Sequence, residues 1–418
     1  MATENPTPGI LPYLTSDLPG AGGAIKRRAE DFRVEEIPSE PIGGRGRHAC
    51  FLVTKRGLTT AAAARRIARF MGVRIEEIGF AGLKDSQAVA SQWMSLPDPD
   101  VGRLKAFRDR QVRIERIGWR PRRLGVGDLA GNRFVVRVRD AGFAQLDAAR
   151  AILDLLVRRG VPNYFGPQRF GSRGDNSAMG ELLLRGELEE FLRVFLGRPC
   201  AGDPPDSREA RKAYDRGDPR LAMRLWPKHC MDPRAALAEL LKRRGPAAAV
   251  RAIDPHVRRL YVEAFQSDVF NDILARRIGT FDRVLVGDIV EEAATGRISS
   301  VDAGAGLAAL RKQAEAFRVS PTGLLPGRDA RMGGGEPGRI ERAVLAERRV
   351  TATLFARPAA PVARAGRRAL RFRLADAAAD AGSDRDGPYL ELAFTTPPGC
   401  YATVVTEEVC KTRQPYSR

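Results

Sequence analysis

Asp85, which follows a glycine that allows a tight turn, is the first residue in this sequence whose side chain could take part in catalysis. Residues 79–93 have the sequence GFAGLKDSQAVASQW, and Lys84 and Asp85 follow Gly82, a residue that allows a tight turn. A carboxylate at the tip of a loop can serve as a nucleophile or a base. Turns and helix caps also use aspartate, and on chemistry alone that ordinary role is the more frequent one. Asp85 is therefore a hypothesis that requires a second signal.

A second segment combines aromatic and amide side chains in a turn-rich stretch. Residues 161–171 have the sequence VPNYFGPQRFG, which contains too many Pro and Gly residues for a regular helix. Aromatic side chains in a loop can stack on an extruded base, and Asn or Gln can read its edge. A hydrophobic latch between two domains explains the same composition equally well. Both interpretations stay open at this point.

The charge of the chain indicates a polyanionic partner. The 418 residues carry a formal net charge of +19, with 43% hydrophobic and 29% charged residues, as in a folded globular protein. Nine Lys or Arg residues lie within 103–123 against two acids, and Lys26, Arg27 and Arg28 form a second cluster. A solvated strand face explains any single basic run, whereas two clusters near Phe107 and Trp119 favour a phosphate-binding surface.

The sequence lacks the residues and motifs that several classes of protein require. Five scattered Cys without a Cys-x-x-Cys pair and three scattered His give no disulfide framework, no metal-ligand spacing and no basis for a Ser/His/Asp triad. Phosphate-binding and dinucleotide-binding glycine motifs are missing, as is any run of about 18 apolar residues. The first 18 residues contain no basic segment followed by an apolar one. We therefore expect a cytoplasmic protein with no metal, no cofactor and no membrane partner.

The periodicity of the chain predicts strands on both sides of a helical middle. Helices are predicted from Thr59 or Thr60 to Met71, over 146–159, and from an Asp254-Pro255 start. The strand-like segments are 25–37, 49–53, 112–119, 133–139, 367–374 and 389–395, with a polar loop between the last two. In 133–139, Phe134, Val136 and Val138 share one face. This order predicts one α+β domain interrupted by an inserted domain.

Four ordered motifs resemble those of the TruD family of tRNA pseudouridine synthases. They lie at residues 25–36, 82–85 (GLKD), 163–171 (NYFGPQRFG) and 398–408 (PGCYATVVTEE). Residues 264–271 (AFQSDVFN) also resemble the helix at the centre of the family's inserted domain. Similarity therefore extends over most of residues 25–410, and four motifs in order are far more specific than any one of them.

The resemblance implies a fold and a division of the chain. The expected fold class is α+β, with an antiparallel-sheet pseudouridine synthase core interrupted by an inserted α/β TRUD domain. The expected parts are a flexible arm (1–24), a discontinuous catalytic domain (25–160 and 360–418) and the inserted domain (161–359). Residues 201–236 are rich in Pro, Asp and Arg, and we expect a family-variable insertion there, partly helical and partly loop.

The resemblance also implies an activity. A pseudouridine synthase is an isomerase that breaks the N-glycosidic bond of uridine in RNA and rejoins C5 of the base to the ribose. Such a reaction consumes no cofactor. The usual target of the family is uridine 13 in the D arm of tRNA, which is the substrate we expect, and we expect the protein to act as a monomer because RNA docking needs a large free face.

The motifs assign roles to individual residues. Asp85 becomes the nucleophile, which is already ionised at neutral pH because an unperturbed aspartate has a pKa of about 3.9. Three alternatives for its step stay open. Asp85 attacks the ribose, attacks the base, or abstracts a proton from the ribose. The expected substrate-binding residues are Lys26 (charge partner of Asp85 or of a phosphate), Phe165 (stacking), Asn163 (fixing the loop or the Asp85 carboxylate), Phe32 and Tyr401 (pocket wall) and, ranked below Lys26, Lys84.

The sequence departs from the family pattern at two places, and other functions remain as alternatives. Ser86 stands where family members often have a basic residue, and the stretch between Gly171 and Glu263 is longer than in compact relatives. A catalytically silent tRNA-binding protein or RNA chaperone of the same fold would need only the basic strands. A methyltransferase would need a glycine-rich cofactor loop, and a membrane-surface protein would need a basic amphipathic helix with apolar anchors. Neither feature is evident.

Overall fold

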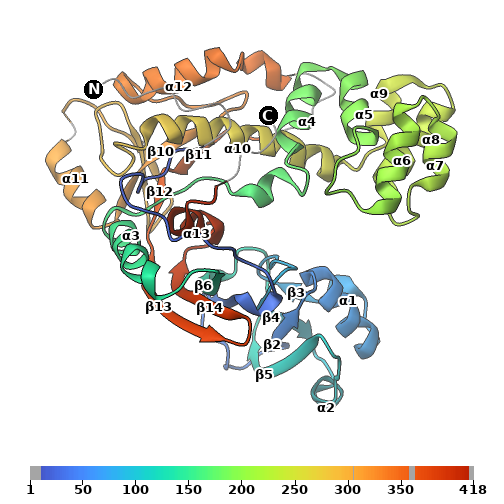
Figure 1. The fold of residues 1–418 in the computed structure, drawn as a ribbon, viewed down its shortest axis with the longest axis horizontal. Helices are drawn as coiled ribbons and strands as arrows, with labels where there is room; N and C mark the ends of the chain where they lie inside the picture. The colour runs from blue at the N-terminus through green and yellow to red at the C-terminus, as the bar shows by residue number, and fades with distance from the viewer. Residues whose placement is uncertain (1–10, 305, 357–362, 414–418) are drawn as a thin grey trace. The chain divides into compact units, whose positions relative to one another are not determined.

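A computed structural model describes residues 11–304, 306–356 and 363–413, which group into two compact units. The sheet unit comprises residues 15–161 and 372–412, and the helical unit comprises the described parts of 1–14, 162–371 and 413–418 (Figure 1). The chain thus leaves the sheet unit after residue 161 and returns to it at residue 372, later than the predicted return at residue 360. Short strands β7 (Val161–Pro162) and β12 (Arg371–Phe372) pair at these crossings.

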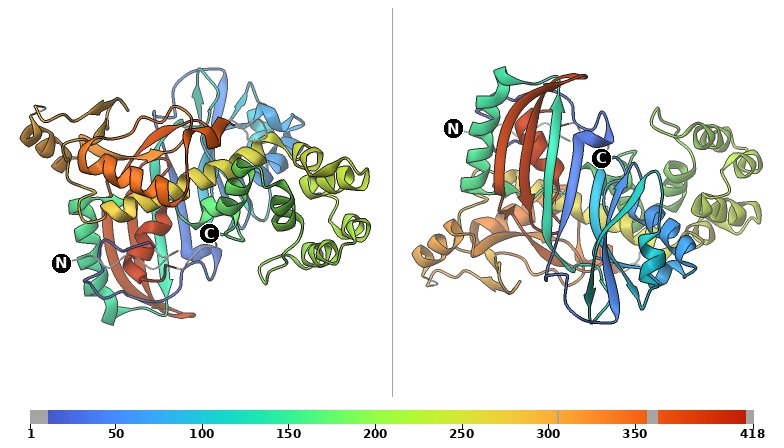
Figure 2. Two further views of the ribbon diagram at one scale, coloured as in Figure 1. Left: turned by 90° about the horizontal axis from the view of Figure 1, so that it is seen from above. Right: turned by 90° about the horizontal axis from the view of Figure 1, so that it is seen from below.

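An eight-stranded sheet forms the centre of the sheet unit. Its strands are β1 (Phe32–Pro38), β2 (His48–Arg56), β3 (Gly79–Phe80), β4 (Val89–Pro97), β5 (Val112–Arg120), β6 (Leu129–Arg139), β13 (Ala375–Asp384) and β14 (Gly387–Thr396). Their order is β13-β14-β6-β1-β4-β2-β5, with β3 paired to β4, and only β1 and β4 are parallel. Figure 2 shows β13 and β14 lying beside β6, from which they are far in sequence. The α+β class with a mainly antiparallel sheet is confirmed.

Alternating side chains explain why β6 and β14 pair in this sheet. Phe134, Val136 and Val138 of β6 are buried, as their period of two predicts. Phe394 and Leu392 of β14 lie opposite Phe134 and Val136 and are fully buried. The rings of Phe134 and Phe394 stack with centroids 5.5 Å apart. The core of the sheet unit is therefore built from segments at both ends of the sequence.

Four helices complete the sheet unit: α1 (Thr60–Met71), α2 (Val101–Lys105), α3 (Leu146–Arg159) and α13 (Ala402–Cys410). Three short 3-10 turns accompany them: η1 (Ala29–Asp31), η2 (Ile75–Glu77) and η3 (Phe143–Gln145). The Thr59 side chain accepts a hydrogen bond of 3.1 Å from the Ala62 amide and caps α1, and Gly72 ends this helix with a φ of 73°. The predicted bounds of α1 and α3 are confirmed.

Two strand predictions in this unit are wrong. The predicted strand over 25–37 begins only at Phe32, because Lys26 has a left-handed φ of 57° and residues 29–31 form the 3-10 turn η1. The polar segment after residue 374 is the ten-residue strand β13 and not a loop. Its alanines and aspartates have weak strand propensity, and pairing with β14 outweighs that propensity.

The described part of the predicted flexible arm is anchored to the rest of the protein. Thr15 is buried, and its hydroxyl donates a hydrogen bond of 2.7 Å to the carboxylate of Glu408. The Ala21 amide donates to the Val409 carbonyl at 2.8 Å. Residues 1–10 of the arm lie outside the described residues. Residues 15–24 therefore behave as an ordered edge of the sheet unit.

The helical unit contains nine helices in its described part: α4 (Asn176–Arg185), α5 (Leu188–Leu196), α6 (Pro205–Asp215), α7 (Pro219–Leu225), α8 (Met231–Leu241), α9 (Gly245–Arg251), α10 (Pro255–Arg277), α11 (Leu307–Glu315) and α12 (Gly335–Glu347). Its sheet has the order β11-β10-β8-β9, from β8 (Ile289–Glu292), β9 (Ile298–Ser300), β10 (Val319–Leu325) and β11 (Gly366–Ala369). The 3-10 turns are η4 (Pro167–Phe170) and η5 (Ala352–Ala356).

Helix α10 is the central element of this unit, and its predicted start is confirmed. The Asp254 side chain accepts a hydrogen bond of 2.7 Å from the His256 amide, and Pro255 occupies the first turn. Most of its buried side chains are apolar, but Gln266, Asp268 and Asn271 are buried as well. Each of these polar groups has a hydrogen-bond partner, as burial requires. Helix α10 therefore also holds loops in place through its polar side chains.

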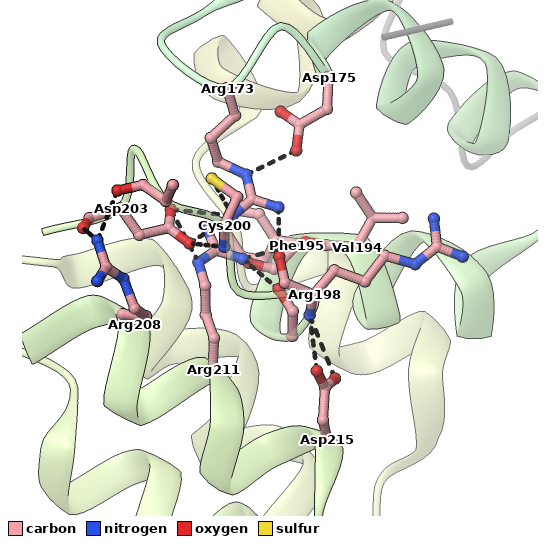
Figure 3. Close-up of polar contacts among 12 residues, drawn as sticks. Arg173, Asp175, Val194, Phe195, Arg198, Cys200, Asp203, Arg208, Arg211 and Asp215 are labelled. Carbon is pink, nitrogen blue, oxygen red and sulfur yellow. Dashed lines mark hydrogen bonds and ion pairs between the residues drawn. The ribbon is translucent and has the colours of Figure 1, made fainter. Parts of the chain in front are cut away.

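Residues 201–236 are partly helical and partly loop, as the sequence predicts. They contain α6, α7 and the first half of α8, joined by short loops. Arg211 of α6 is 8% exposed, and its guanidinium donates to three carbonyl oxygens at the end of α5, those of Val194, Phe195 and Gly197. Figure 3 shows this contact and the neighbouring ion pair between Arg173 and Asp203, 2.8 Å apart. A cation at a helix C-terminus satisfies carbonyls that the helix leaves free.

Candidate active site

Asp85 lies on the loop between β3 and β4, with its carboxylate held from two sides. The Lys26 ammonium forms a hydrogen-bonded ion pair with Oδ2 of Asp85. The Gln87 amide donates to Oδ1 at 2.8 Å. The Asp85 side chain is 25% exposed, whereas that of Lys26 is 15% exposed. The carboxylate is thus oriented by the protein and still accessible from solvent.

The surroundings of Asp85 keep its carboxylate ionised. Partial burial raises its pKa, but the Lys26 hydrogen bond, the Gln87 amide and the positive charges of Lys26 and Lys55 together lower it more. The net result is a pKa below the ordinary value of 3.8. Asp85 is therefore fully charged at neutral pH and suited to act as a nucleophile rather than as an acid.

Residues 22–26 bring Lys26 to this carboxylate by running along β6. Ala24 exchanges two backbone hydrogen bonds with Arg139, of 2.8 and 2.9 Å. A Cβ on Gly23 would lie 2.5 Å from the Arg139 carbonyl oxygen, so only glycine fits at that position. Lys26 itself has a φ of 57°, which costs a non-glycine residue about 1–2 kcal/mol. The fold thus holds Lys26 in a strained conformation that directs its ammonium to Asp85.

A second lysine, Lys55, fixes the backbone of the loop that carries Asp85. Lys55 of β2 is fully buried, and its ammonium donates to the carbonyl oxygens of Asp85 (2.7 Å) and Leu58 (2.6 Å). Burial lowers the pKa of Lys55 to about 8. The negative charge of Asp85 raises this pKa, and the positive charge of Lys84 lowers it further. Lys55 therefore fixes the position of the loop that carries Asp85.

Thr60 and Gln92 complete the support of the loop. The Thr60 hydroxyl accepts a hydrogen bond of 2.9 Å from the Lys84 amide and donates one of 2.7 Å to the Gln92 side chain. Gln92 in turn donates to the Gly82 carbonyl at 3.2 Å. Both side chains are buried. The backbone of residues 82–85 is thus fixed at Gly82, at Lys84 and at Asp85.

Lys84 points into the protein and not toward solvent. Its ammonium lies 2.5 Å from Oε2 of Glu36 on β1, and the two side chains are 6% and 1% exposed. The other carboxylate oxygen of Glu36 accepts from the Trp93 amide at 3.1 Å. The sequence predicted Lys84 as a substrate-binding residue ranked below Lys26, and that stays a prediction. The buried ion pair shows that Lys84 also supports the loop.

We expect the Lys84→Met variant to lose about 3–5 kcal/mol in free energy of unfolding, because it leaves the Glu36 carboxylate buried without its cation. Urea denaturation of wild type and variant measures this loss. The double variant Glu36→Gln/Lys84→Met should recover much of it, since neither buried charge remains. A single variant that stays within about 1 kcal/mol of wild type would contradict a structural role for the pair.

The predicted wall residues Phe32 and Tyr401 both belong to the sheet unit. Phe32 begins β1 and is 3% exposed, and its ring lies edge-on to that of Phe134 with centroids 5.8 Å apart. The Lys26 ammonium lies 4.4 Å from the centre of the Phe32 ring. Phe32 therefore supports Lys26 directly. Tyr401 is half-buried at the position preceding α13.

Asn163 and Phe165 belong to the helical unit, where they order their own loop. The Asn163 side chain donates to the Ala369 carbonyl at 2.9 Å and accepts from Arg368 at 2.5 Å. Phe165 exchanges backbone hydrogen bonds of 2.9 and 3.0 Å with the Asn271 side chain. The Arg368 guanidinium lies 4.2 Å from the centre of the Phe165 ring. Asn163 thus fixes the loop, one of its two predicted roles.

The basic clusters are partly neutralised by acids in the sheet unit. Arg27 and Arg28 form ion pairs with Asp140 and Asp386. Within 103–123, Arg113 pairs with Glu115 at 3.2 Å, and Arg120 pairs with Glu40 at 2.6 Å. Several basic side chains of the same region are exposed to solvent: those of Arg103, Lys105, Arg110 and Arg122.

Within residues 11–304, 306–356 and 363–413, no group of three or more His, Cys, Asp or Glu side chains is arranged to hold a metal ion. No helix in these ranges has both the length and the apolar character needed to cross a membrane.

Comparison with known proteins adds the decisive observation. The family model described as tRNA pseudouridine synthase D (TruD) matches residues 9–409. The chain belongs to the TruD family. It is 39% identical over 404 residues to a tRNA pseudouridine synthase D of Geobacter metallireducens, covering 96% of this chain and 98% of that one. A homologue of the same name from Geobacter sp. strain M21 is 37% identical and covers 96% and 99%.

A solved structure supports the same assignment. A crystal structure described as a tRNA pseudouridine synthase D (TruD) from Methanosarcina mazei superposes with a TM-score of 0.81 at 28% identity and covers 97% of both chains. The predicted membership of the TruD family, and with it the class of enzyme, is confirmed. The chain is an isomerase, a tRNA pseudouridine synthase.

Sequence reasoning missed the residues that support the TruD motif around Asp85. Lys55 could have been identified from the sequence, because a lysine near the end of a mainly apolar strand indicates a buried charge that needs a partner. Glu36 lies in the first motif, but its partner could not be named from the sequence. Asp31 is fully buried and accepts a hydrogen bond of 2.9 Å from Arg139. These pairs join positions far apart in the chain, which spacing alone does not reveal.

Proposed function

We propose that this protein converts uridine 13 in the D arm of tRNA to pseudouridine, with Asp85 as the nucleophile. The chain belongs to the TruD family, and the resemblance to that family implies uridine 13 as the target. The observation that carries the role of Asp85 is its carboxylate, ionised by Lys26 yet 25% exposed, on a loop anchored at three backbone positions. Such preorganisation suits a group that must meet a reacting atom.

The proposed reaction is an isomerisation in which every atom is conserved. The bond between N1 of the base and C1′ of the ribose breaks, and a bond between C5 and C1′ forms. C5 loses its proton, and N1 gains one. Asp85 carries the nucleophilic step, and its carboxylate is regenerated at the end, so no co-reactant is consumed. The target base must first leave its stack, at a cost of a few kcal/mol.

The other predicted residues have supporting roles in this proposal. Lys26 keeps Asp85 charged and oriented, and Phe32 supports Lys26. We keep Phe165 as a stacking partner for a base, Asn163 as the residue that orders its loop, and Tyr401 as part of the pocket wall. The exposed basic side chains of 103–123 supply contacts to phosphates. We place the protein in the cytoplasm as a monomer that needs no metal ion.

The experiment uses two unmodified transcripts of one tRNA, which differ only in uridine or cytidine at position 13. Each is incubated with the protein without added cofactor, treated with carbodiimide and copied by primer extension. We expect a stop at position 13 only in the uridine transcript. A stop at another uridine would overturn position 13. No stop on any tRNA, with binding that weakens as salt rises, would favour the catalytically silent RNA-binding alternative.

A further inference from the structure

The two most exposed large apolar side chains of the described residues lie on the loops at Asp85. Leu83 is 76% exposed and Val126 is 87% exposed. Leu83 lies on the catalytic loop itself, two residues before Asp85. The loop of Val126 is joined to it by a hydrogen bond of 2.9 Å from the Gly127 amide to the Ala81 carbonyl. Single exposed apolar residues are common on protein surfaces, but a pair on adjoining loops at a catalytic carboxylate is not scattered.

The protein holds Leu83 outward through polar contacts on either side of it. Ala81 is 1% exposed and the Lys84 side chain is 6% exposed, so the residues near Leu83 point inward. Burial of a leucine side chain is favourable, so an exposed leucine gives up stabilisation. The structure instead buries the Lys84 ammonium against Glu36 and fixes the backbone at Gly82 and Lys84. Leu83 is therefore presented to solvent by a rigid support.

Leu83 lies close enough to Asp85 along the chain to reach a base next to one held at Asp85. Two residues of extended chain span at most about 7 Å, and successive nucleotides of one strand rise by about 3.4 Å. A uridine that reaches Asp85 therefore leaves the neighbouring one or two bases within reach of Leu83. Exposed apolar side chains are the groups that proteins insert between bases to unstack them.

We propose that Leu83 is a positioning residue that inserts into the RNA stack beside the target uridine and stabilises its extruded state. This inference rests on the proposed function, because it requires a uridine at Asp85. The leucine side chain replaces part of the stacking that the extruded base gives up. Leu83 touches the flanking bases and forms no bond with the reacting atoms.

The test follows extrusion directly in the unreactive Asp85→Asn background. A tRNA transcript carries 2-aminopurine immediately 3′ of the target uridine, and its fluorescence rises when the neighbouring base unstacks. We expect Asp85→Asn/Leu83→Ala to lose most of the rise seen with Asp85→Asn, and Asp85→Asn/Leu83→Met to restore it. With Asp85 present, Leu83→Ala should lower kcat about 10- to 100-fold, equivalent to about 1.4–2.7 kcal/mol, and change KM much less.

The control is Phe143→Ala, which removes a side chain that is 75% exposed on another part of the sheet unit. Its fluorescence and kcat should equal those of its parent. An unchanged fluorescence rise in Asp85→Asn/Leu83→Ala, or a loss that Leu83→Met does not restore, would overturn the inference. The 2-aminopurine is placed beside whichever uridine the wild-type protein modifies. An error in position 13 is therefore detected by the mapping experiment and does not affect the test of Leu83.

Discussion

Replacement of Asp85 by asparagine is expected to lower the rate of pseudouridine formation by at least about 10⁴-fold while the protein still binds tRNA. Loss of a nucleophile typically has an effect of this size or larger. Asparagine keeps the shape of the side chain and an oxygen that can accept the Gln87 amide, so the loop should retain its conformation. Single-turnover mapping by carbodiimide and primer extension measures the rate.

Asp98→Asn is the matched control for this substitution. Asp98 is a surface aspartate, 60% exposed, in an ion pair of 2.8 Å with Arg47. Exposed pairs contribute about 0–1 kcal/mol, so this variant should retain wild-type activity and stability. Because phosphate contacts dominate the affinity for RNA, the salt dependence of binding should be the same in wild type and Asp85→Asn. Pseudouridine formed by Asp85→Asn within tenfold of the wild-type rate would remove Asp85 from the role of nucleophile.

Lys26→Met is expected to lower kcat by about 10²-fold at neutral pH and to move the acid limb of the pH profile to higher pH. The first effect follows because a carboxylate displaced by about 1 Å loses about 10²-fold in rate. The second follows from the pKa of Asp85. In wild type the Lys26 hydrogen bond and charge are among the causes that lower this pKa, while burial raises it. Without Lys26 its hydrogen bond and its charge no longer lower the pKa of Asp85, so that pKa rises.

The direction of the pH effect is fixed by the chemistry. The proposed mechanism needs ionised Asp85, so activity should be lost as the pH falls through the pKa of that group. A higher pKa therefore means that activity disappears at a higher pH in Lys26→Met than in wild type. The measurement is kcat under single-turnover conditions across the acid range. Lys26→Arg keeps a cation and should keep the acid limb near that of wild type. An acid limb that does not move in Lys26→Met would show that Lys26 does not control the ionisation of Asp85.

The local sequence was sufficient for the elements whose signals lie within a few residues. Thr59 and Gly72 mark the ends of α1, and Asp254-Pro255 marks the start of α10, because capping depends on backbone groups in a single turn. The alternation of Phe134, Val136 and Val138 predicted the buried face of β6, because successive side chains of a strand point to opposite faces of the sheet. The local sequence was not sufficient for β13. Its alanines and aspartates form a strand only because β14 supplies the backbone hydrogen-bond partners.

The sequence by itself determined the family and the class of reaction, because short ordered motifs such as residues 82–85 and 163–171 are specific enough to be identified without a structure. The same motifs single out Asp85 as the residue that we propose as nucleophile. Tertiary structure alone decided the partner of each charge. Lys84 and Asp85 are adjacent in the chain, yet one is buried against Glu36 and the other is exposed and paired with Lys26. The physical reason is that ion pairing and burial depend on distances across β1, β4 and the segment before β1, and chain spacing does not encode those distances.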